Sequence, residues 1–197
     1  DIHNELISRG FESIVCYANG PKVRESGVYK ISSTPYQKIQ ALRNRITGLM
    51  YGGCVISTMR IFSIIKKEKP DIVHLQCING HTANIYRLVT FLKKNHIKTI
   101  LTLHAEFMYT ANCGHAYECN KWKTGCGHCP RLREETKTLI FDRTHHSWKK
   151  MKRAFDQFNT LKVVSVSPWL MERAKCSPIL IDKEHHVIFN GIDTDVF

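Results

Sequence analysis

Segments with strand character alternate with segments with helical character along almost the whole chain. Short apolar runs of strand length cover residues 13–18, 27–32, 71–76, 97–103, 162–166 and 186–189. Apolar residues at helical spacing fall between them, over residues 36–46, 54–67, 83–95, 147–158 and 168–174. This alternation predicts an α/β fold: a Rossmann-like parallel sheet with helices on both faces, joined by right-handed crossovers.

The chain opens on a helix instead of a strand. Residues 1–9 have helical character, and Gly10 is free to take the left-handed conformation that closes a helix. Doubly wound folds begin with a strand, a turn and then a helix, so we expect a first strand upstream of Asp1. A chain of 197 residues is long enough for one sizeable α/β domain, which we expect to span residues 1–197.

Polar residues follow the predicted strands at the points where the strands end. They are Asn19, Gly20, Asn79, Gly80, His81, His104, Glu106, Ser167, Asn190 and Gly191. Ligands of open α/β sheets bind outside the carboxyl ends of the strands, so these residues predict one site at that edge. Turn or helix-capping roles are the alternative, and we favour them for Asn19, Gly20 and Ser167.

The chain is strongly basic, with 29 Lys and Arg against 17 Asp and Glu and a formal charge of +12. Such a charge favours polyanions, anionic lipid head groups or phosphate-bearing substrates as partners. No apolar run approaches the length of a membrane-spanning helix. Eight cysteines spread over the chain, with no visible signal peptide, indicate a reducing compartment.

The helix predicted over residues 147–158 has an aromatic face within a basic surround. Trp148, Met151, Phe155 and Phe158 share that face, and four Lys or Arg residues surround it. A basic amphipathic helix of this kind can lie on an anionic membrane. The same face can pack on the sheet, which is the alternative that we favour.

Four cysteines are concentrated in a segment that interrupts the alternation. Cys126 and Cys129 have the spacing that lets two thiolates reach one ion, and Cys113 and Cys119 can supply the other corners of a tetrahedron. We expect a structural zinc ion, with His115 or His128 as substitute ligands. Two disulfides, a redox pair or four unrelated thiols are the alternatives. The excursion over residues 105–146 is too long for a structureless loop, and zinc would hold it in place.

Several motifs together resemble a known family. They are PDIVHLQ at 70–76, INGHTANI at 78–85, TLHAEF at 102–107, the cysteine block at 113–130, SPWL at 167–170 and NGIDTDVF at 190–197. Their order is similar to the N-terminal domain of a family 4 retaining glycosyltransferase of GT-B fold, of the kind encoded in bacterial capsule, exopolysaccharide and colanic acid clusters. The chain departs from that pattern at Gln76-Cys77, where the subgroup often has His-Asn.

The resemblance implies an acceptor-binding half of an enzyme with two Rossmann-like domains. A nucleotide sugar would be the donor, held mainly by the other domain, and a lipid-linked saccharide the acceptor, with transfer under retention. The 197-residue chain alone would then be inactive. Residues 190–197 would begin the interdomain linker, with Asn190 and Gly191 on the donor side. The location would be cytoplasmic, at the inner face of the bacterial inner membrane.

The resemblance also implies roles for single residues. His104 matches a histidine that contacts the transferred sugar or the phosphates, and Glu106 would orient it or accept a proton from the acceptor. The acceptor would be bound by Asn79, Gly80, His81, Asn84, Lys121, Trp122, Lys123 and Ser167. The alternatives are a packed strand-end histidine, a solvated loop carboxylate, and a capping tryptophan between exposed lysines.

Two other function classes fit parts of the sequence. The charge and the cysteines are compatible with a zinc-stabilised nucleic-acid-binding module, but the basic residues are scattered and no RNA-binding strand pattern is present. We therefore do not expect a nucleic acid partner. A non-catalytic interaction domain derived from the same fold is a third possibility.

Overall fold

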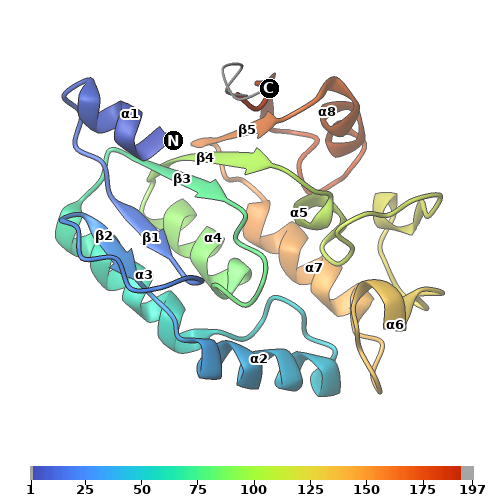
Figure 1. The fold of residues 1–197 in the computed structure, drawn as a ribbon. Helices are drawn as coiled ribbons and strands as arrows, with labels where there is room; N and C mark the ends of the chain where they lie inside the picture. The colour runs from blue at the N-terminus through green and yellow to red at the C-terminus, as the bar shows by residue number, and fades with distance from the viewer. Residues whose placement is uncertain (1, 192–197) are drawn as a thin grey trace, which may run out of the picture.

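The strands of the structure, a computed structural model that describes residues 2–191, are all parallel. A four-stranded sheet has the sequential order β3 (Ile72–Gln76), β4 (Lys98–Leu103), β5 (Leu161–Ser165) and β6 (Glu184–Val187). A second sheet contains two strands, β1 (Val15–Tyr17) and β2 (Val28–Lys30). The predicted parallel α/β fold is confirmed (Figure 1).

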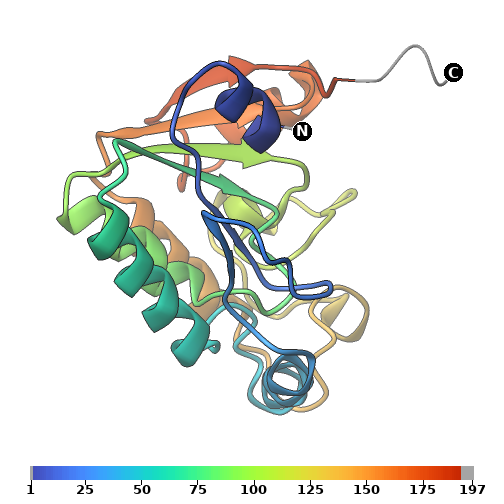
Figure 2. The ribbon, with the colours of Figure 1, turned by 60° about the vertical axis from the view of Figure 1, so that its left-hand side comes forward.

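Helices lie on both faces of the four-stranded sheet. The longer ones are α1 (Ile2–Ser8), α2 (Thr34–Thr47), α3 (Val55–Glu68), α4 (Ile85–Lys94), α7 (Thr144–Phe155) and α8 (Pro168–Lys175). The short ones are α5 (Phe107–Thr110), the 3-10 helix η1 (Lys121–Lys123) and α6 (Leu132–Glu135). In Figures 1 and 2, α3, α4 and α7 lie together on one side of the sheet, whereas α1 and α8 lie on the other.

The two sheets share no ladder of hydrogen bonds, although we expected a single sheet. Strand β1 of one and β3 of the other each stand at a sheet edge. In the doubly wound strand order 3-2-1-4-5-6, β1 corresponds to the second strand of the fold and β3 to the fourth. The first strand of the fold lies between these two positions.

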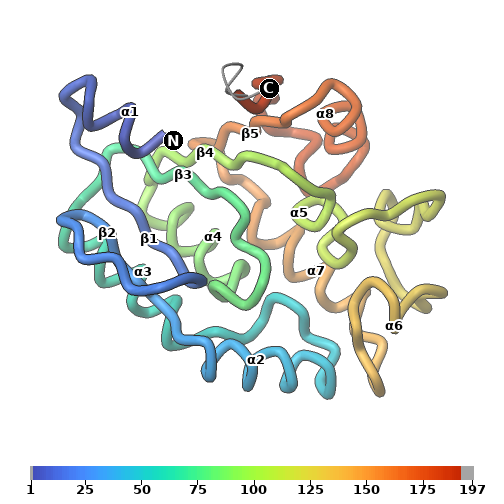
Figure 3. Tube along the Cα trace, viewed as in Figure 1, coloured from blue at the N-terminus to red at the C-terminus, as the bar shows by residue number. Residues whose placement is uncertain are grey.

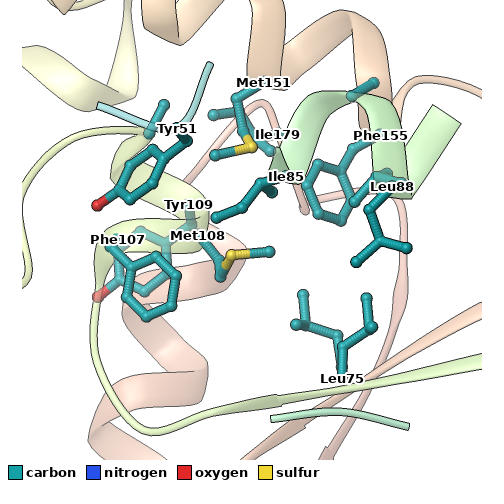
Figure 4. Close-up of a cluster of buried hydrophobic side chains, with 14 of the residues drawn as sticks. Tyr51, Leu75, Ile85, Leu88, Phe107, Met108, Tyr109, Met151, Phe155 and Ile179 are labelled. Carbon is teal, nitrogen blue, oxygen red and sulfur yellow. The ribbon is translucent and has the colours of Figure 1, made fainter. Parts of the chain in front are cut away.

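The main core lies between the four-stranded sheet and helices α4 and α7. Along β4, Thr99, Leu101 and Leu103 are buried and alternate with more exposed residues, as the two-residue period of a strand requires. Four apolar residues of α4 that the sequence places inward are buried: Ile85, Leu88, Val89 and Leu92. Figure 4 shows side chains of α4, α5 and α7 converging with Leu75 of β3.

The aromatic face of α7 packs inside the protein. Trp148, Met151 and Phe155 of α7 are buried, and so is Phe158, which follows the end of the helix. The Trp148 indole N–H donates a hydrogen bond to the Trp122 carbonyl at 2.8 Å. The packing alternative for this helix is confirmed. A membrane contact through this face is thereby excluded, and no described helix is long and apolar enough to cross a bilayer.

Helix α3 does not bury all the apolar residues that its sequence spacing places on one face. Ile65 is buried and Phe62 stacks on Phe91 with ring centroids 4.1 Å apart, but Val55 and Met59 are exposed. The small residues Ser57 and Thr58 face inward instead. The Thr58 hydroxyl accepts from the Asn84 backbone N–H at 2.8 Å, which fixes this side of α3 against the start of α4.

Candidate functional site

Strands β3, β4 and β5 end at one edge of the sheet because they are parallel and in register. Gln76 at the end of β3 is paired with Thr102, and Leu103 at the end of β4 is paired with Ser165. The segments that follow these strands therefore start side by side, at the arrowheads in Figure 1. The predicted strand-end residues His104 and Ser167 are brought to this edge together.

His104 belongs to a strip of polar side chains on the open face of β3 and β4. His74 Nε2 lies 2.7 Å from the Thr102 hydroxyl, and the Gln76 amide nitrogen lies 3.2 Å from His74 Nε2. Burial, and secondly the neighbouring His104, lower the pKa of His74. His74 and Thr102 are absent from the candidates predicted from the sequence, and Gln76 was noted only as a departure from the expected His-Asn pair. Their position along the predicted strands could have identified them, because residues 74, 76, 102 and 104 lie on one face of adjacent parallel strands.

Glu106 is buried and fully occupied by hydrogen bonds. Its Oε1 accepts from the Tyr109 hydroxyl and from Arg173 Nε, both at 2.5 Å. Its Oε2 accepts from the Ala116 N–H at 2.5 Å and lies 2.9 Å from His115 Nδ1. A carboxylate has about four lone-pair sites, so none is left for an acceptor hydroxyl.

These contacts also set the ionisation of Glu106. Burial alone would raise its pKa, but the hydrogen bonds from Tyr109, Ala116 and Arg173, with the Arg173 charge, outweigh burial and hold the pKa below the ordinary value. The side chain therefore ties α5 and α8 to the 114–116 loop as a buried carboxylate. The geometry gives Glu106 an anchoring position and not the contact with His104 that we expected.

The Lys121-Trp122-Lys123 segment forms the short helix η1. Trp122 is 1% exposed, its indole N–H donates to the Cys119 carbonyl at 2.7 Å, and its ring packs against Tyr109 with centroids 5.2 Å apart. Lys121 Nζ donates to the Gly127 and His128 carbonyls at 3.2 and 2.7 Å. Trp122 is thus a core residue, whereas Lys123 stays exposed.

An aromatic residue that the sequence reasoning passed over is exposed nearby. Trp169, in the first turn of α8, is 53% exposed. The Arg173 guanidinium lies 5.1 Å from the Trp169 ring and 5.4 Å from the Trp122 ring. A cavity of about 290 Å³ opens there, lined by Trp122, Lys123, Trp169, Glu172, Arg173 and Cys176. The SPWL motif could have identified Trp169, because it places a tryptophan shortly after the end of a strand.

The loop after β3 divides into an exposed and a packed part. Asn79 and Gly80 are exposed. Asn84 is buried, caps α4 by accepting from the Arg87 N–H at 3.0 Å, and donates to the Gly52 carbonyl at 2.7 Å. His81 Nδ1 lies 3.0 Å from Asn44 Nδ2, and burial lowers the His81 pKa. Of the four predicted acceptor residues in this loop, Asn79 and Gly80 are exposed, His81 is half-buried and Asn84 is buried.

The remaining predicted positions follow the carboxyl ends of the last two strands, β5 and β6. Ser167 accepts from the Leu170 N–H at 3.3 Å as the N-cap of α8, the role that we favoured from the sequence. Asn190 and Gly191 are exposed at the end of the described chain. The other residues of the predicted linker, 192–197, lie outside the described residues.

Figure 3 follows the path of the 105–146 excursion. Its four cysteines are free thiols, and they lie close enough for their charges to interact. Burial, and then the neighbouring thiols, raise the pKa of Cys113 to about 12. Burial likewise raises the pKa of Cys126 to about 12, opposed by the Asn112 side chain and reinforced by Cys119 and Cys129. Within residues 2–191, however, no group of three or more His, Cys, Asp or Glu side chains is arranged to hold a metal.

Together these features describe a polar edge suited to a hydroxylated, anionic ligand. Neutral and charged imidazoles can exchange hydrogen bonds with hydroxyl or phosphate groups. An exposed indole beside a cation can contact the apolar face of a ring while the cation holds a charge.

Two comparisons with known proteins bear on this arrangement. Residues 1–196 match the family model Glycosyltransferase Family 4. Over 211 aligned residues the chain is 24% identical to the putative colanic acid biosynthesis glycosyl transferase WcaC of Escherichia coli (strain K12). That alignment covers 98% of this chain and 50% of the relative, so the chain spans about half the relative's length. No solved structure matches the chain.

Proposed function

Because the chain belongs to glycosyltransferase family 4, we propose that it forms the acceptor-binding half of an enzyme that transfers a sugar from a nucleotide sugar to a saccharide, with retention. The observation that carries the proposal is the family match over residues 1–196 together with a histidine-bearing carboxyl edge. The relative's assignment to colanic acid biosynthesis supports a bacterial surface polysaccharide as product and a lipid-linked saccharide as acceptor.

His104 is the proposed residue at the reaction centre. It is exposed beyond the end of β4, where ligands of parallel sheets bind. A protonated imidazole can donate to a leaving phosphate or a sugar hydroxyl, and a neutral one can accept. The strip formed by His74, Gln76 and Thr102 would position this histidine and the bound sugar, whereas Glu106 would act only through the architecture around it.

The acceptor is proposed to lie between the exposed loop after β3 and the start of α8. Asn79 and Gly80 would contact its hydroxyl groups, and Trp169 would stack on a sugar ring. Lys123 supplies positive charge at the cavity beside Trp169, which suits the pyrophosphate of a lipid-linked saccharide, whereas the Arg173 charge is already paired with Glu106. Asn190 and Gly191 would face the nucleotide-sugar side.

We retain two further parts of the sequence-based proposal. One is a structural zinc ion held by Cys113, Cys119, Cys126 and Cys129. Its support is that these half-buried thiols lie near one another, and they would have to close on the ion to tetrahedral distances. The other is a cytoplasmic location, supported by eight free cysteines.

A His104→Ala variant of the complete enzyme tests the proposed function. Loss of a positioned acid or base lowers turnover by about a hundredfold or more, so we expect that loss with an unchanged melting temperature. The assay follows sugar transfer from a labelled nucleotide sugar to a lipid-linked saccharide. His146→Ala, at an exposed position of α7, is the matched control and should keep full activity. Full activity of the His104→Ala enzyme would remove His104 from the reaction.

A further inference from the structure

Three aromatic side chains follow one another on the surface beside the ends of β4 and β5. The His115 ring contacts both of the others, with centroids 5.9 Å from Trp169 and 4.2 Å from Tyr117. Trp169 and Tyr117 are each 53% exposed, and the His115 side chain is 47% exposed. Single exposed rings are common on protein surfaces, whereas a contiguous group of them marks a binding surface. Trp169, His115 and Tyr117 are called the aromatic row below.

The aromatic row starts at the carboxyl edge of the four-stranded sheet. Trp169 stands in the first turn of α8, shortly after the end of β5. The Glu106 N–H donates to the Gly114 carbonyl at 2.9 Å, which holds the loop that carries His115 beside the segment that follows His104. In Figure 1, α8 and the yellow-green first part of the excursion both lie beyond the arrowhead of β4. The row therefore leads from the proposed reacting edge onto the surface of the excursion.

Separate contacts hold the first two rings of the row in place. His115 Nδ1 lies 2.9 Å from the carboxylate of Glu106, which is itself buried. Trp169 follows Pro168 in the capped first turn of α8, and the Arg173 guanidinium lies 5.1 Å from its ring. Both rings are thus fixed by groups that belong to the folded core of the excursion.

Tyr117 is fixed from the other end of the row. The Arg131 guanidinium lies 4.1 Å from the centroid of its ring, and Arg131 is held in turn by Glu134 at 3.0 Å and Glu135 at 2.7 Å. Tyr117 also has φ +49°, a left-handed conformation that is uncommon for a residue other than glycine. The half-exposed ring is therefore preorganised, and a ligand that contacts it loses little free energy in ordering it.

The shape and charge of the row favour a saccharide over a nucleic acid. The planes of the rings turn by 37° from Trp169 to His115 and by 74° from His115 to Tyr117, which suits a twisted chain of sugar rings. Each sugar ring has an apolar C–H face that packs on an aromatic ring. Surfaces that bind single-stranded nucleic acid combine aromatic rings with positive charge along the backbone. The arginines beside the row, Arg131 and Arg173, already form ion pairs with carboxylates.

We propose that the aromatic row binds successive sugars of the acceptor, so that the acceptor is a saccharide of at least two sugars. This inference rests on the proposed acceptor-binding function. Each step between neighbouring centroids is comparable with the length of one sugar ring, so the row from Trp169 to Tyr117 accommodates two sugars. An acceptor of this length is itself the product of an earlier glycosyl transfer. The enzyme would therefore extend an existing saccharide chain instead of starting one.

A fluorescence titration of the purified protein with saccharides of increasing length tests the proposal. Of the three tryptophans, Trp169 is the exposed one, so a sugar that stacks on the row changes its emission. The probes are size-separated fragments of one, two and three sugars from partial acid hydrolysis of colanic acid, the polysaccharide named for the relative. We expect the two longer fragments to bind about tenfold more tightly than the single sugar, because only they reach a second ring.

Variants of Tyr117 locate the second sugar. Tyr117→Ala should lower the affinity for the two-sugar fragment by about tenfold and change that for the single sugar by less than about twofold. Tyr117→Phe keeps the ring and should restore the affinity for the longer fragment. Phe11→Ala removes an exposed aromatic ring from the loop after α1 and is the matched control. If the alanine variant fails to fold, Tyr117→Asn gives the same test, because asparagine accepts the left-handed conformation.

The outcomes separate this proposal from the proposed function. Equal affinity for all three lengths would overturn the proposal alone, and so would a Tyr117→Ala protein that binds the two-sugar fragment as tightly as the Phe11→Ala control. Failure of every fragment to bind would overturn the acceptor-binding function and the row with it. Length-dependent binding by a complete enzyme that transfers no sugar would count against the proposed transfer reaction and leave the row as a saccharide site.

Discussion

Glu106 is the residue whose surroundings say most about how the excursion is held. Its four hydrogen-bond partners come from α5, from α8 and from the 114–116 loop, and only Arg173 among them carries a permanent charge. Breaking a buried charged pair costs far more than breaking an exposed one, because the remaining charge loses both water and partner. The ionisation of Glu106 is therefore coupled to folding.

This coupling predicts an acid-sensitive stability. The folded-state pKa of Glu106 lies below its ordinary value of about 4.3, so its contribution is complete above that value and is lost as pH falls through the folded pKa. Glu106→Gln should lower the free energy of unfolding at neutral pH by about 2–4 kcal/mol and flatten its dependence on acid pH. Urea unfolding at several pH values measures both; Glu118→Gln, an exposed carboxylate, is the control.

Two tryptophans separate a packing role from a binding role. Trp122→Ala should lower the free energy of unfolding by about 3–5 kcal/mol, because the side chain is buried. Trp169→Ala should change stability by less than about 1 kcal/mol and raise the KM for the acceptor by about tenfold with kcat nearly unchanged, because a half-exposed ring mainly binds. An unchanged KM in the Trp169 variant would remove Trp169 from the acceptor site.

At the scale of elements, helix faces were predictable where apolar residues decide the packing. Helix α4 buries the four apolar residues that its spacing places inward. Helix α3 does not, because Thr58 and Asn84 form a hydrogen bond between elements that no local pattern contains. Helix α2 is held by carbonyls of Ala18 and Met50, so its orientation depends on residues distant in sequence.

Contacts between residues distant in sequence also decide which features of the candidate site could be predicted. His104 was predictable, because an apolar strand ends there and the end of a parallel strand faces the ligand. The exposure of Trp169 and the burial of Trp122 were not, because Trp122 stands between two lysines and Trp169 between Pro168 and Leu170, which favours the opposite assignment. Only the fold of the excursion, which places Trp122 under Tyr109, distinguishes them.

The cysteine segment gives a prediction of its own. Protein purified without chelators should contain about one equivalent of zinc, because four thiolates bind this ion tightly. Cys126→Ser/Cys129→Ser should lose the metal and lower the melting temperature, since the excursion would lose its tether. Cys16→Ser/Cys176→Ser removes two exposed thiols and should keep the zinc. Metal content below about half an equivalent in the wild type would refute the zinc site.

At the scale of the whole molecule, two kinds of exposed surface lie on different elements. The polar strip lies on β3 and β4, whereas exposed apolar side chains lie on α2 and residues 139–141. The proposed reacting edge is therefore built from strand ends and not from helix α2.

The proposed division of the substrates between two halves predicts what this chain can do alone. The 197 residues should bind a saccharide acceptor but transfer no sugar, because the donor must be held in line with the acceptor for the barrier to fall. Calorimetry with a soluble acceptor analogue measures the first property, and the labelled transfer assay measures the second. The complete enzyme, carrying the same residues together with a donor domain, should perform both. Sugar transfer by the isolated chain above the uncatalysed rate would show that it also holds the donor, and the assignment of two substrates to two halves would be abandoned.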